Sequence, residues 1–279
     1  MNSIKNIVFV TNKLKEKSLP LAEKLVGYAE GIGLETKILD VENLEHKQFE
    51  GVELCCVLGG DGTLLSCLEY VIEKDIAIFG INFGKLGFLA TFTDDICQED
   101  FISILQGEHK ISTRSLLSLT KGQDSFLALN DIVIRDNNHQ RMYRATVYAN
   151  DEYIADYFAD GIILATPTGS TAYNLSAGGP LLTPNLNAFL LTPICPHALS
   201  NRSIIFDGAR QIAIESKVQG GNIYIDGNFK LAIAQNEKIF VKIADKKIRF
   251  LRALGHSHFK LLRTKLAWAE DPRKYDSSI

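Results

Sequence analysis

The chain has 279 residues and a formal net charge of −3, and 46% of its residues are hydrophobic while 23% are charged. This composition is typical of a globular protein, and the length suffices for one large domain or two ordinary ones. The slightly negative charge gives no support to nucleic-acid binding, and no apolar run approaches the roughly 18 residues of a membrane span. We expect a cytoplasmic protein, because the first residues lead directly into a predicted strand and not into a signal peptide.

Strands and helices alternate over roughly the first 110 residues. Apolar runs predict strands at 4–10, 35–39, 51–58 and 77–81. Helices are expected from Pro20 to about Glu30 and from Asp95 to Gln106, with Gly107 ending the second. This alternation favours an α/β domain with a mostly parallel sheet.

Near residue 113 the pattern changes to short strands separated by turns. One hairpin is predicted from 115–119 and 126–134, and another from 142–149 and 152–158. Further short strands are expected at 162–165, 203–206, 211–215, 222–225, 238–243 and 247–251. This half is therefore predicted to be mainly antiparallel β, and the apolar residues of the tail, Phe259, Leu261, Leu262, Leu266 and Trp268, should pack back on the body.

Five cysteines occur without Cys-x-x-Cys spacing, mostly in apolar surroundings such as those of Cys55, Cys56 and Cys67. An odd number with this spacing argues against a disulfide framework or a zinc site. We predict that the cysteines are buried thiols.

The segment Gly59-Gly60-Asp61-Gly62-Thr63 joins the strand at 51–58 to a run of apolar residues at helical spacing. Glycines at a helix N-terminus let an anion approach free backbone N–H groups, so Gly59, Gly60, Gly62 and Thr63 are candidates for binding a nucleotide phosphate. Beside a phosphate, a carboxylate is useful if it accepts the proton of an attacking hydroxyl, which makes Asp61 a candidate general base. A tight turn with Asp61 as the helix N-cap explains these five residues equally well.

A second cluster, residues 160–180, is rich in glycine and hydroxyl side chains and contains a single tyrosine, Tyr173. A loop of this kind can close over a base and a ribose with hydrogen bonds and one aromatic face. Its composition fits slightly better with an irregular turn whose Ser and Thr hydroxyls bond to the local backbone.

The order of the motifs resembles the NAD kinases. The resemblance rests on Gly-Gly-Asp-Gly-Thr at 59–63, residues 82–88, Asn130-Asp131, the 160–180 cluster and residues 191–202, and it extends from about residue 4 to Trp268. Gly-Gly-Asp-Gly alone also resembles the diacylglycerol and sphingosine kinases, and only the later motifs separate these families.

This resemblance implies an enzyme that transfers the γ-phosphoryl group of ATP to the 2′-hydroxyl of the adenosine ribose of NAD, which yields NADP and ADP. Asp61 would accept the proton, and Mg²⁺ or another divalent metal ion would arrive with ATP. By position, the NAD site would contain Asp61, Gly62, Phe83, Asn130, Asp131, Arg141, Asp160, Thr171, Ala172, Tyr173, Asn174, Leu175, Ser176 and Asn228. Asp131 stands where many relatives have Glu, which keeps the charge and shortens the reach by one methylene.

The family fold implied is an α/β domain, residues 1–113 with the returning tail 257–279, and a β-rich NAD-binding domain, residues 114–256, with the site in the cleft between them. The resemblance also implies a homodimer or homotetramer, with NAD and ATP as small-molecule partners. Two other functions remain open: a lipid kinase sharing the glycine loop, and a non-catalytic NAD-binding sensor.

Overall fold

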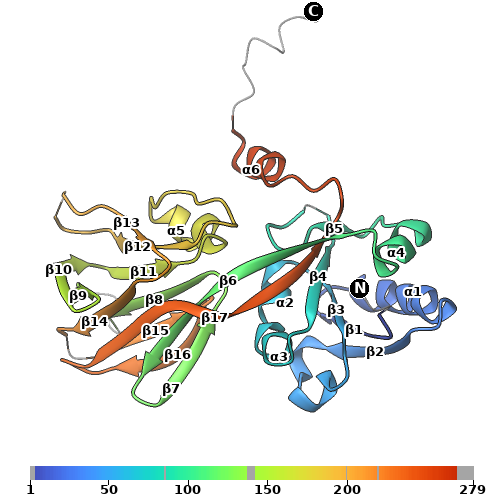
Figure 1. Cartoon of the computed structure of the whole chain (residues 1–279), viewed down its shortest axis with the longest axis horizontal. Coiled ribbons are helices and arrows are strands. Elements are labelled where there is room, and N and C mark those ends of the chain that lie inside the picture. Colours follow the sequence, from blue (N-terminus) through green and yellow to red (C-terminus); the bar gives the residue numbers. More distant parts are fainter. Residues whose placement is uncertain (1–3, 85, 137–141, 199, 219, 269–279) are drawn as a thin grey trace, which may run out of the picture. The chain divides into compact units, whose positions relative to one another are not determined.

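The computed structural model describes residues 4–84, 86–136, 142–198, 200–218 and 220–268 (Figure 1). Its contacts divide the chain into two compact units: unit 1 comprises residues 1–112 and 249–279, and unit 2 comprises residues 113–248. Among the helices within these ranges, none is long and apolar enough to cross a membrane.

Unit 1 contains a parallel sheet in the order β2-β1-β3-β4, and both β5 and Phe250 of β17 pair with β4. Its strands are β1 (Asn6–Thr11), β2 (Glu35–Asp40), β3 (Leu54–Leu58), β4 (Ala77–Asn82) and β5 (Phe92–Thr93). Since all these pairings are parallel, the predicted α/β class is confirmed for this half of the chain. The apolar runs that form β3 and β4 are buried at almost every residue, as expected for strands covered on both faces.

The helices of unit 1 follow the strands. They are α1 (Ser18–Gly31), α2 (Asp61–Leu65), α3 (Leu68–Glu73), α4 (Gln98–Leu105) and α6 (His258–Leu266), with two short 3-10 helices, η1 (Val41–Asn43) and η2 (His46–Phe49). Helix α1 packs against β1, β2 and α4 (Figure 1). Its buried Leu25 belongs to the same core cluster as Phe9 and Phe101. Helix α4 begins later than predicted, because Cys97 precedes it as an N-cap whose Sγ accepts the N–H of Asp100 at 3.4 Å.

The apolar face after the glycine loop is carried by two helices. Leu64, Leu68 and Val71 are buried on this face, as their spacing predicts. The chain turns between α2 and α3, where Ser66 Oγ donates to the carbonyl of Gly62 at 3.3 Å. Side chains that bond to a carbonyl four residues earlier commonly bend a helix.

Unit 2 contains antiparallel strands in two sheets. The first has the order β10-β9-β14-β17 with the β6–β7 hairpin on β17, and the second has the order β13-β12-β11-β8-β15-β16. The strands are β6 (Lys110–Lys121), β7 (Asp124–Ala128), β8 (Asp131–Asp136), β9 (Tyr143–Ala149), β10 (Glu152–Ala159), β11 (Gly161–Ala165), β12 (Ala188–Ile194), β13 (Ile204–Asp207), β14 (Gln211–Ser216), β15 (Gly221–Ile225), β16 (Asn228–Ile233) and β17 (Lys238–Arg252). Buried residues from both sheets, such as Val147 and Ile162, form one cluster, so the sheets share a core. The predicted antiparallel β class is confirmed.

Three details differ from the expected strands. The predicted strand 126–134 is two strands, since β7 ends at Ala128 and the N–H groups of Leu129 and Asn130 donate to a side chain, Asp226, instead of a neighbouring strand. The two strands predicted at 238–243 and 247–251 are one continuous strand, β17. Strands β5, β12 and β16 were not predicted.

Two residues of the tail and two of the cysteines are more exposed than predicted. Helix α6 buries Leu261 and Leu262, but Phe259 is 58% exposed and Trp268 is 49% exposed, so their expected packing is wrong. All five cysteines are free thiols, and three of them are buried. Cys97 and Cys195 are exposed, which contradicts the prediction for these two, because each lies at the end of a regular element where the chain reaches the surface.

Candidate functional site

In unit 1 the glycine loop joins β3 to α2, as predicted. Gly60 is the N-cap of α2 and Asp61 is its first residue. The interpretation of Asp61 as an N-cap is therefore wrong. A Cβ on Gly59 would lie 2.5 Å from Thr63 Oγ1, so the tight turn requires glycine at this position.

The carboxylate of Asp61 points away from its own helix and accepts three backbone hydrogen bonds. Oδ1 accepts the N–H groups of Leu89 at 3.1 Å and Ala90 at 2.9 Å, and Oδ2 accepts that of Phe88 at 2.9 Å. A Cβ on Gly87 would lie 2.0 Å from Oδ1, so the carboxylate fits against this glycine. Because Asp61 is half-buried and Oδ2 accepts a single N–H of this segment, Oδ2 retains a lone pair for a hydroxyl donor.

The other candidates in unit 1 differ in exposure. Gly62 is exposed, and nothing would obstruct a Cβ there within 4 Å. Thr63 is buried, and its hydroxyl accepts the Nδ2–H of Asn12 at 3.1 Å, so its side chain braces the loop. Phe83 is half-buried.

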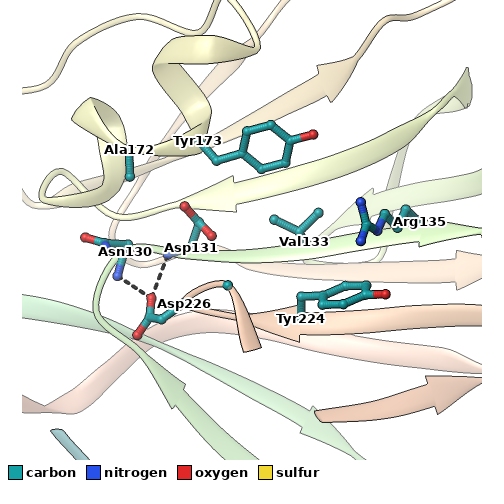
Figure 2. A pocket seen from close by; sticks show the side chains of 9 residues that line it. Asn130, Asp131, Val133, Arg135, Ala172, Tyr173, Tyr224 and Asp226 are labelled. Atoms are coloured by element: carbon teal, nitrogen blue, oxygen red, sulfur yellow. Dashed lines mark hydrogen bonds between the residues drawn. The ribbon is translucent and has the colours of Figure 1, made fainter. Parts of the chain in front are cut away.

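Unit 2 contains a cavity of about 360 Å³ (Figure 2). Strand β8, the turn after β15 and the 160–180 cluster supply its walls. The lining residues are Asn130, Asp131, Val133, Arg135, Ala172, Tyr173, Tyr224, Asp226 and Gly227. Four of them, Asn130, Asp131, Ala172 and Tyr173, were predicted to belong to the NAD site.

Asp226 fixes the backbone at the start of β8. Its Oδ1 accepts the N–H groups of Asn130 at 2.7 Å and Asp131 at 3.0 Å (Figure 2). Its Oδ2 accepts the N–H of Leu129 at 2.9 Å. In return, the N–H of Asp226 donates to the carbonyl of Asp131 at 3.0 Å. Asp226 and Gly227 have φ values of +49° and +83°, as in a two-residue hairpin turn between β15 and β16. The turn therefore presents the carboxylate that holds the cavity wall.

The cavity contains two neighbouring acids, of which Asp131 is buried and Asp226 is half-buried. Burial, and secondarily the charge of Asp226, raise the pKa of Asp131 from 3.8 to about 7, although the N–H of Tyr173 acts in the opposite direction. Burial also raises the pKa of Asp226, while the three N–H groups from Leu129 to Asp131 oppose this shift. Asp131 can thus donate or accept a hydrogen bond near neutral pH, which suits a pair of sugar hydroxyls.

Strand alternation brings Asp131, Val133 and Arg135 to the same face of β8. Figure 2 shows Tyr173 and Tyr224 on opposite sides of this row of side chains. The guanidinium carbon of Arg135 lies 4.4 Å from the centre of the Tyr224 ring, which is within range of a cation–π contact. Carboxylate and amide groups at one end and aromatic rings with a cation at the other are suited to a ligand that combines sugars, rings and phosphates.

The hydroxyl groups of the 160–180 cluster bond mainly within the protein. Thr166 Oγ1 donates to the carbonyl of Leu129, Ser170 Oγ to that of Pro167 at 2.7 Å and Thr171 Oγ1 to that of Thr168 at 3.1 Å. These three hydroxyls therefore bond to backbone carbonyls, as the composition of the cluster predicted.

Asn174 holds the cluster together from inside. It is fully buried, its Nδ2 donates to the carbonyls of Ser170 and Pro180, and its Oδ1 accepts the hydroxyl of Thr192 at 2.7 Å. A Cβ on Gly169 would lie 1.9 Å from the carbonyl oxygen of Asn130, so glycine allows the cluster to meet β8. Asn174 therefore braces the loop that carries Tyr173, and its contact with NAD stays a prediction.

The remaining predicted NAD contacts do not line this cavity. Thr171 and Leu175 are half-buried, whereas Asp160, Ser176 and Asn228 are exposed. Arg141 lies outside the described residues. Contact of these residues with NAD stays a prediction.

Five cavity residues were missed by the sequence analysis: Val133, Arg135, Tyr224, Asp226 and Gly227. For Asp226 a signal existed, because Asp-Gly between two apolar runs is a strong hairpin pattern. For Arg135 and Tyr224, the alternation of side chains along β8 and β15 shows which residues share a face of the sheet. It does not show which face borders a cavity.

The chain matches two family models. Residues 8–109 match the ATP-NAD kinase N-terminal domain and residues 129–253 match the ATP-NAD kinase C-terminal domain. An NAD kinase of Lachnoclostridium phytofermentans is 33% identical over 281 residues, covering 94% of this chain and 99% of the relative. An NAD kinase of Clostridium botulinum is 36% identical over 274 residues, covering 95% and 97%.

Solved structures show the same fold. A yeast NADH kinase in complex with NADH has a TM-score of 0.80 at 23% identity, covering 97% of this chain and 90% of that one. An NAD kinase from Archaeoglobus fulgidus in complex with ATP has a TM-score of 0.77 at 21% identity, covering 94% and 97%. Because the models match most of the chain and the curated relatives align over nearly its whole length, the chain belongs to the NAD kinase family.

Proposed function

We propose that the chain transfers the γ-phosphoryl group of ATP to the 2′-hydroxyl of the adenosine ribose of NAD, which produces NADP and ADP. The observation that carries this proposal is Asp61, whose carboxylate is held by three backbone N–H groups and keeps a lone pair on Oδ2. Membership of the NAD kinase family identifies the chain as an ATP-dependent phosphotransferase, and it makes NAD the acceptor.

Asp61 would act as the general base. As the 2′-hydroxyl oxygen attacks the γ-phosphorus, its proton passes to Asp61 Oδ2, while the bond between the γ-phosphorus and the bridging oxygen breaks and ADP leaves. Phosphoryl transfer depends mainly on alignment and on neutralising the phosphate oxygens, so one positioned carboxylate is sufficient protein chemistry for the proton step.

The cavity in unit 2 would bind part of NAD. Asn130 and Asp131 together offer amide donors and carboxylate acceptors, a combination that fits the vicinal hydroxyls of a ribose. Tyr173, 41% exposed at the cavity, offers an aromatic face to a ring of the dinucleotide.

A divalent metal ion is needed to neutralise the phosphate oxygens, and we propose that it is Mg²⁺ bound to ATP as part of that substrate. Within the described parts of the chain, no three His, Cys, Asp or Glu side chains are grouped so that they could hold a metal ion. We therefore assign no protein residues to the metal. Cytoplasmic location and a homodimeric or homotetrameric assembly stay predictions.

The experiment is to incubate the purified chain with NAD, ATP and Mg²⁺ and to measure NADP. NADH is tested in parallel as the acceptor, because a similar structure is a NADH kinase with NADH bound. Diacylglycerol replaces NAD in a third reaction, and phosphorylation of this lipid instead of NAD would identify a lipid kinase. Binding of NAD without any NADP formation would identify a sensor.

A further inference from the structure

The segment that holds Asp61 is itself held from its other side by Arg252, the last residue of β17. Arg252 Nη1 donates to the carbonyl of Leu89 at 2.8 Å and to that of Phe88 at 3.3 Å. The N–H groups of Phe88, Leu89 and Ala90 donate to Asp61. The guanidinium of Arg252 and the carboxylate of Asp61 thus bond to the same two peptide groups.

The geometry of a peptide group links these contacts. The carbonyl of Phe88 and the N–H of Leu89 belong to one planar peptide, and the carbonyl of Leu89 and the N–H of Ala90 belong to the next. In a trans peptide these two groups point in opposite directions, and this chain contains no cis peptide among its described residues. Each plane is therefore fixed at its oxygen by a cation and at its N–H by an anion. Hydrogen bonds in series polarise one another, so the donor to the carbonyl also strengthens the bond to Asp61.

Arg252 is well suited to fix this segment. Its side chain is 3% exposed, and Phe250, two residues earlier, pairs with Ile78 of the parallel sheet. The guanidinium carbon also lies 5.0 Å from the centre of the Phe250 ring. A buried cation on a paired strand has little freedom to move, so its contacts define where the two peptide planes lie.

We propose that Arg252 is a positioning residue for phosphoryl transfer, which acts on Asp61 through the two peptide groups between Phe88 and Ala90. This inference rests on the proposed role of Asp61 as the proton acceptor. Arg252 itself is assigned no contact with either substrate. Its loss should impair the proton-transfer step and leave NAD binding nearly unchanged, because the cavity residues assigned to NAD lie in unit 2.

The first test is Arg252→Met, which keeps much of the apolar stem and removes the donors. We expect kcat to fall by about 10- to 100-fold, the effect of a small misplacement of a reacting group. KM for NAD should stay within about twofold of the unmodified chain. Arg252→Lys retains a cation that can donate to both carbonyls. Its kcat should lie between that of the unmodified chain and that of Arg252→Met.

Arg249→Met is the matched control on the same strand. Its guanidinium is partly exposed, and its Nε donates to Asp75 Oδ1 at 3.2 Å. Exposed ion pairs contribute little, so kcat should change by less than about twofold. A loss equal to that of Arg252→Met would show a general effect of strand β17 and would overturn the proposal.

A double-mutant cycle separates positioning from general destabilisation. In the Asp61→Asn background, Arg252→Met should lower the residual kcat by less than about twofold, because the group that it positions is gone. The same fold loss in both backgrounds would contradict the proposal, as would an unchanged kcat in Arg252→Met. Thermal unfolding and NAD binding establish that each variant is folded.

If Arg252→Met does not fold, the cycle is measured with Arg252→Lys, and additive losses would again overturn the inference. The unmodified chain is assayed first. Absence of NADP would overturn the proposed function together with this inference, whereas NADP formation with additive losses would overturn the inference alone.

Discussion

The backbone N–H of Asn130 donates a hydrogen bond to Asp226 Oδ1 at 2.7 Å, although the two residues are 96 positions apart in the chain. The same carboxylate accepts the N–H groups on either side of Asn130. A hairpin turn thus holds the residues that were predicted to bind a ribose. The position of the amide side chain of Asn130 depends on a residue with no assigned contact to the substrate.

Asp226→Ala should destabilise the protein and weaken NAD binding. Three backbone N–H groups would lose their acceptor in a largely buried place, which costs on the order of 3 kcal/mol of unfolding free energy. Chemical denaturation and KM for NAD measure both effects. Asp151→Ala is the matched control, because Asp151 also has a positive φ, +67°, in a two-residue turn but is exposed. Equal losses in the two variants would show that turn geometry, and not the carboxylate, is responsible.

Asp61→Asn should retain NAD binding and lose at least about two orders of magnitude in kcat. The amide cannot take up the proton, and its NH₂ group would also meet one of the N–H donors of the 88–90 segment. Calorimetric titration with NAD and steady-state kinetics give the two quantities. Near-normal turnover would refute the assignment of the base. Glu69→Gln, an exposed acid on α3, serves as the control and should behave like the unmodified chain.

Asn130→Ala should raise KM for NAD and change kcat little, because the amide is assigned to binding and not to the chemical step. Steady-state kinetics at saturating ATP would measure the effect. A fall in kcat at constant KM would argue against a binding role.

Gly169→Ala should disturb the position of Asn130 through its backbone. The new Cβ would lie 1.9 Å from the carbonyl oxygen of Asn130, so the backbone of β8 or of the cluster must move. We expect a rise in KM for NAD and a loss of about 1 to 3 kcal/mol of unfolding free energy. Gly27→Ala in α1 meets no atom within 4 Å, and it should be neutral or slightly stabilising. A neutral Gly169→Ala would contradict the close approach.

Asp131 should make stability depend on pH. Its pKa is about 7 in the folded protein and near 3.8 when exposed, so between these values the folded state holds a proton that the unfolded state has lost. Stability from this residue is therefore highest at low pH, declines as pH rises from about 4 to about 7, and is constant above that range.

The comparison with Asp131→Asn isolates this contribution. Between pH 5 and pH 8 the unmodified chain should lose on the order of 2 to 3 kcal/mol of unfolding free energy more than the variant does. Urea unfolding at several pH values measures the difference. Parallel pH curves for the two proteins would show that Asp131 titrates normally. Asp151→Asn, at an exposed position, should leave the curve of the unmodified chain unchanged.

Local patterns in the sequence were sufficient for the two fold classes and for the glycine loop. The apolar runs of β1, β3 and β4 are long enough to indicate buried parallel strands, and the Asn150-Asp151 turn indicates its hairpin, because each signal lies within a few residues. The assignment of Asp61, Asn130 and Tyr173 to a nucleotide site relied on the order of several motifs, which together resemble one family.

Only the tertiary structure decided which atoms face each other. Asp61 could have capped its own helix, but it bonds to a segment 27 to 29 residues later, and Asp226 bonds to residues 95 to 97 positions earlier. Composition favoured the backbone only slightly over a ligand as the partner of the hydroxyls in the 160–180 cluster, and in the structure Thr166, Ser170 and Thr171 donate to backbone carbonyls. Periodicity reports which residues are buried or exposed, whereas hydrogen-bond partners distant in the chain are chosen by how strands and turns pack, and no short stretch of sequence contains that information.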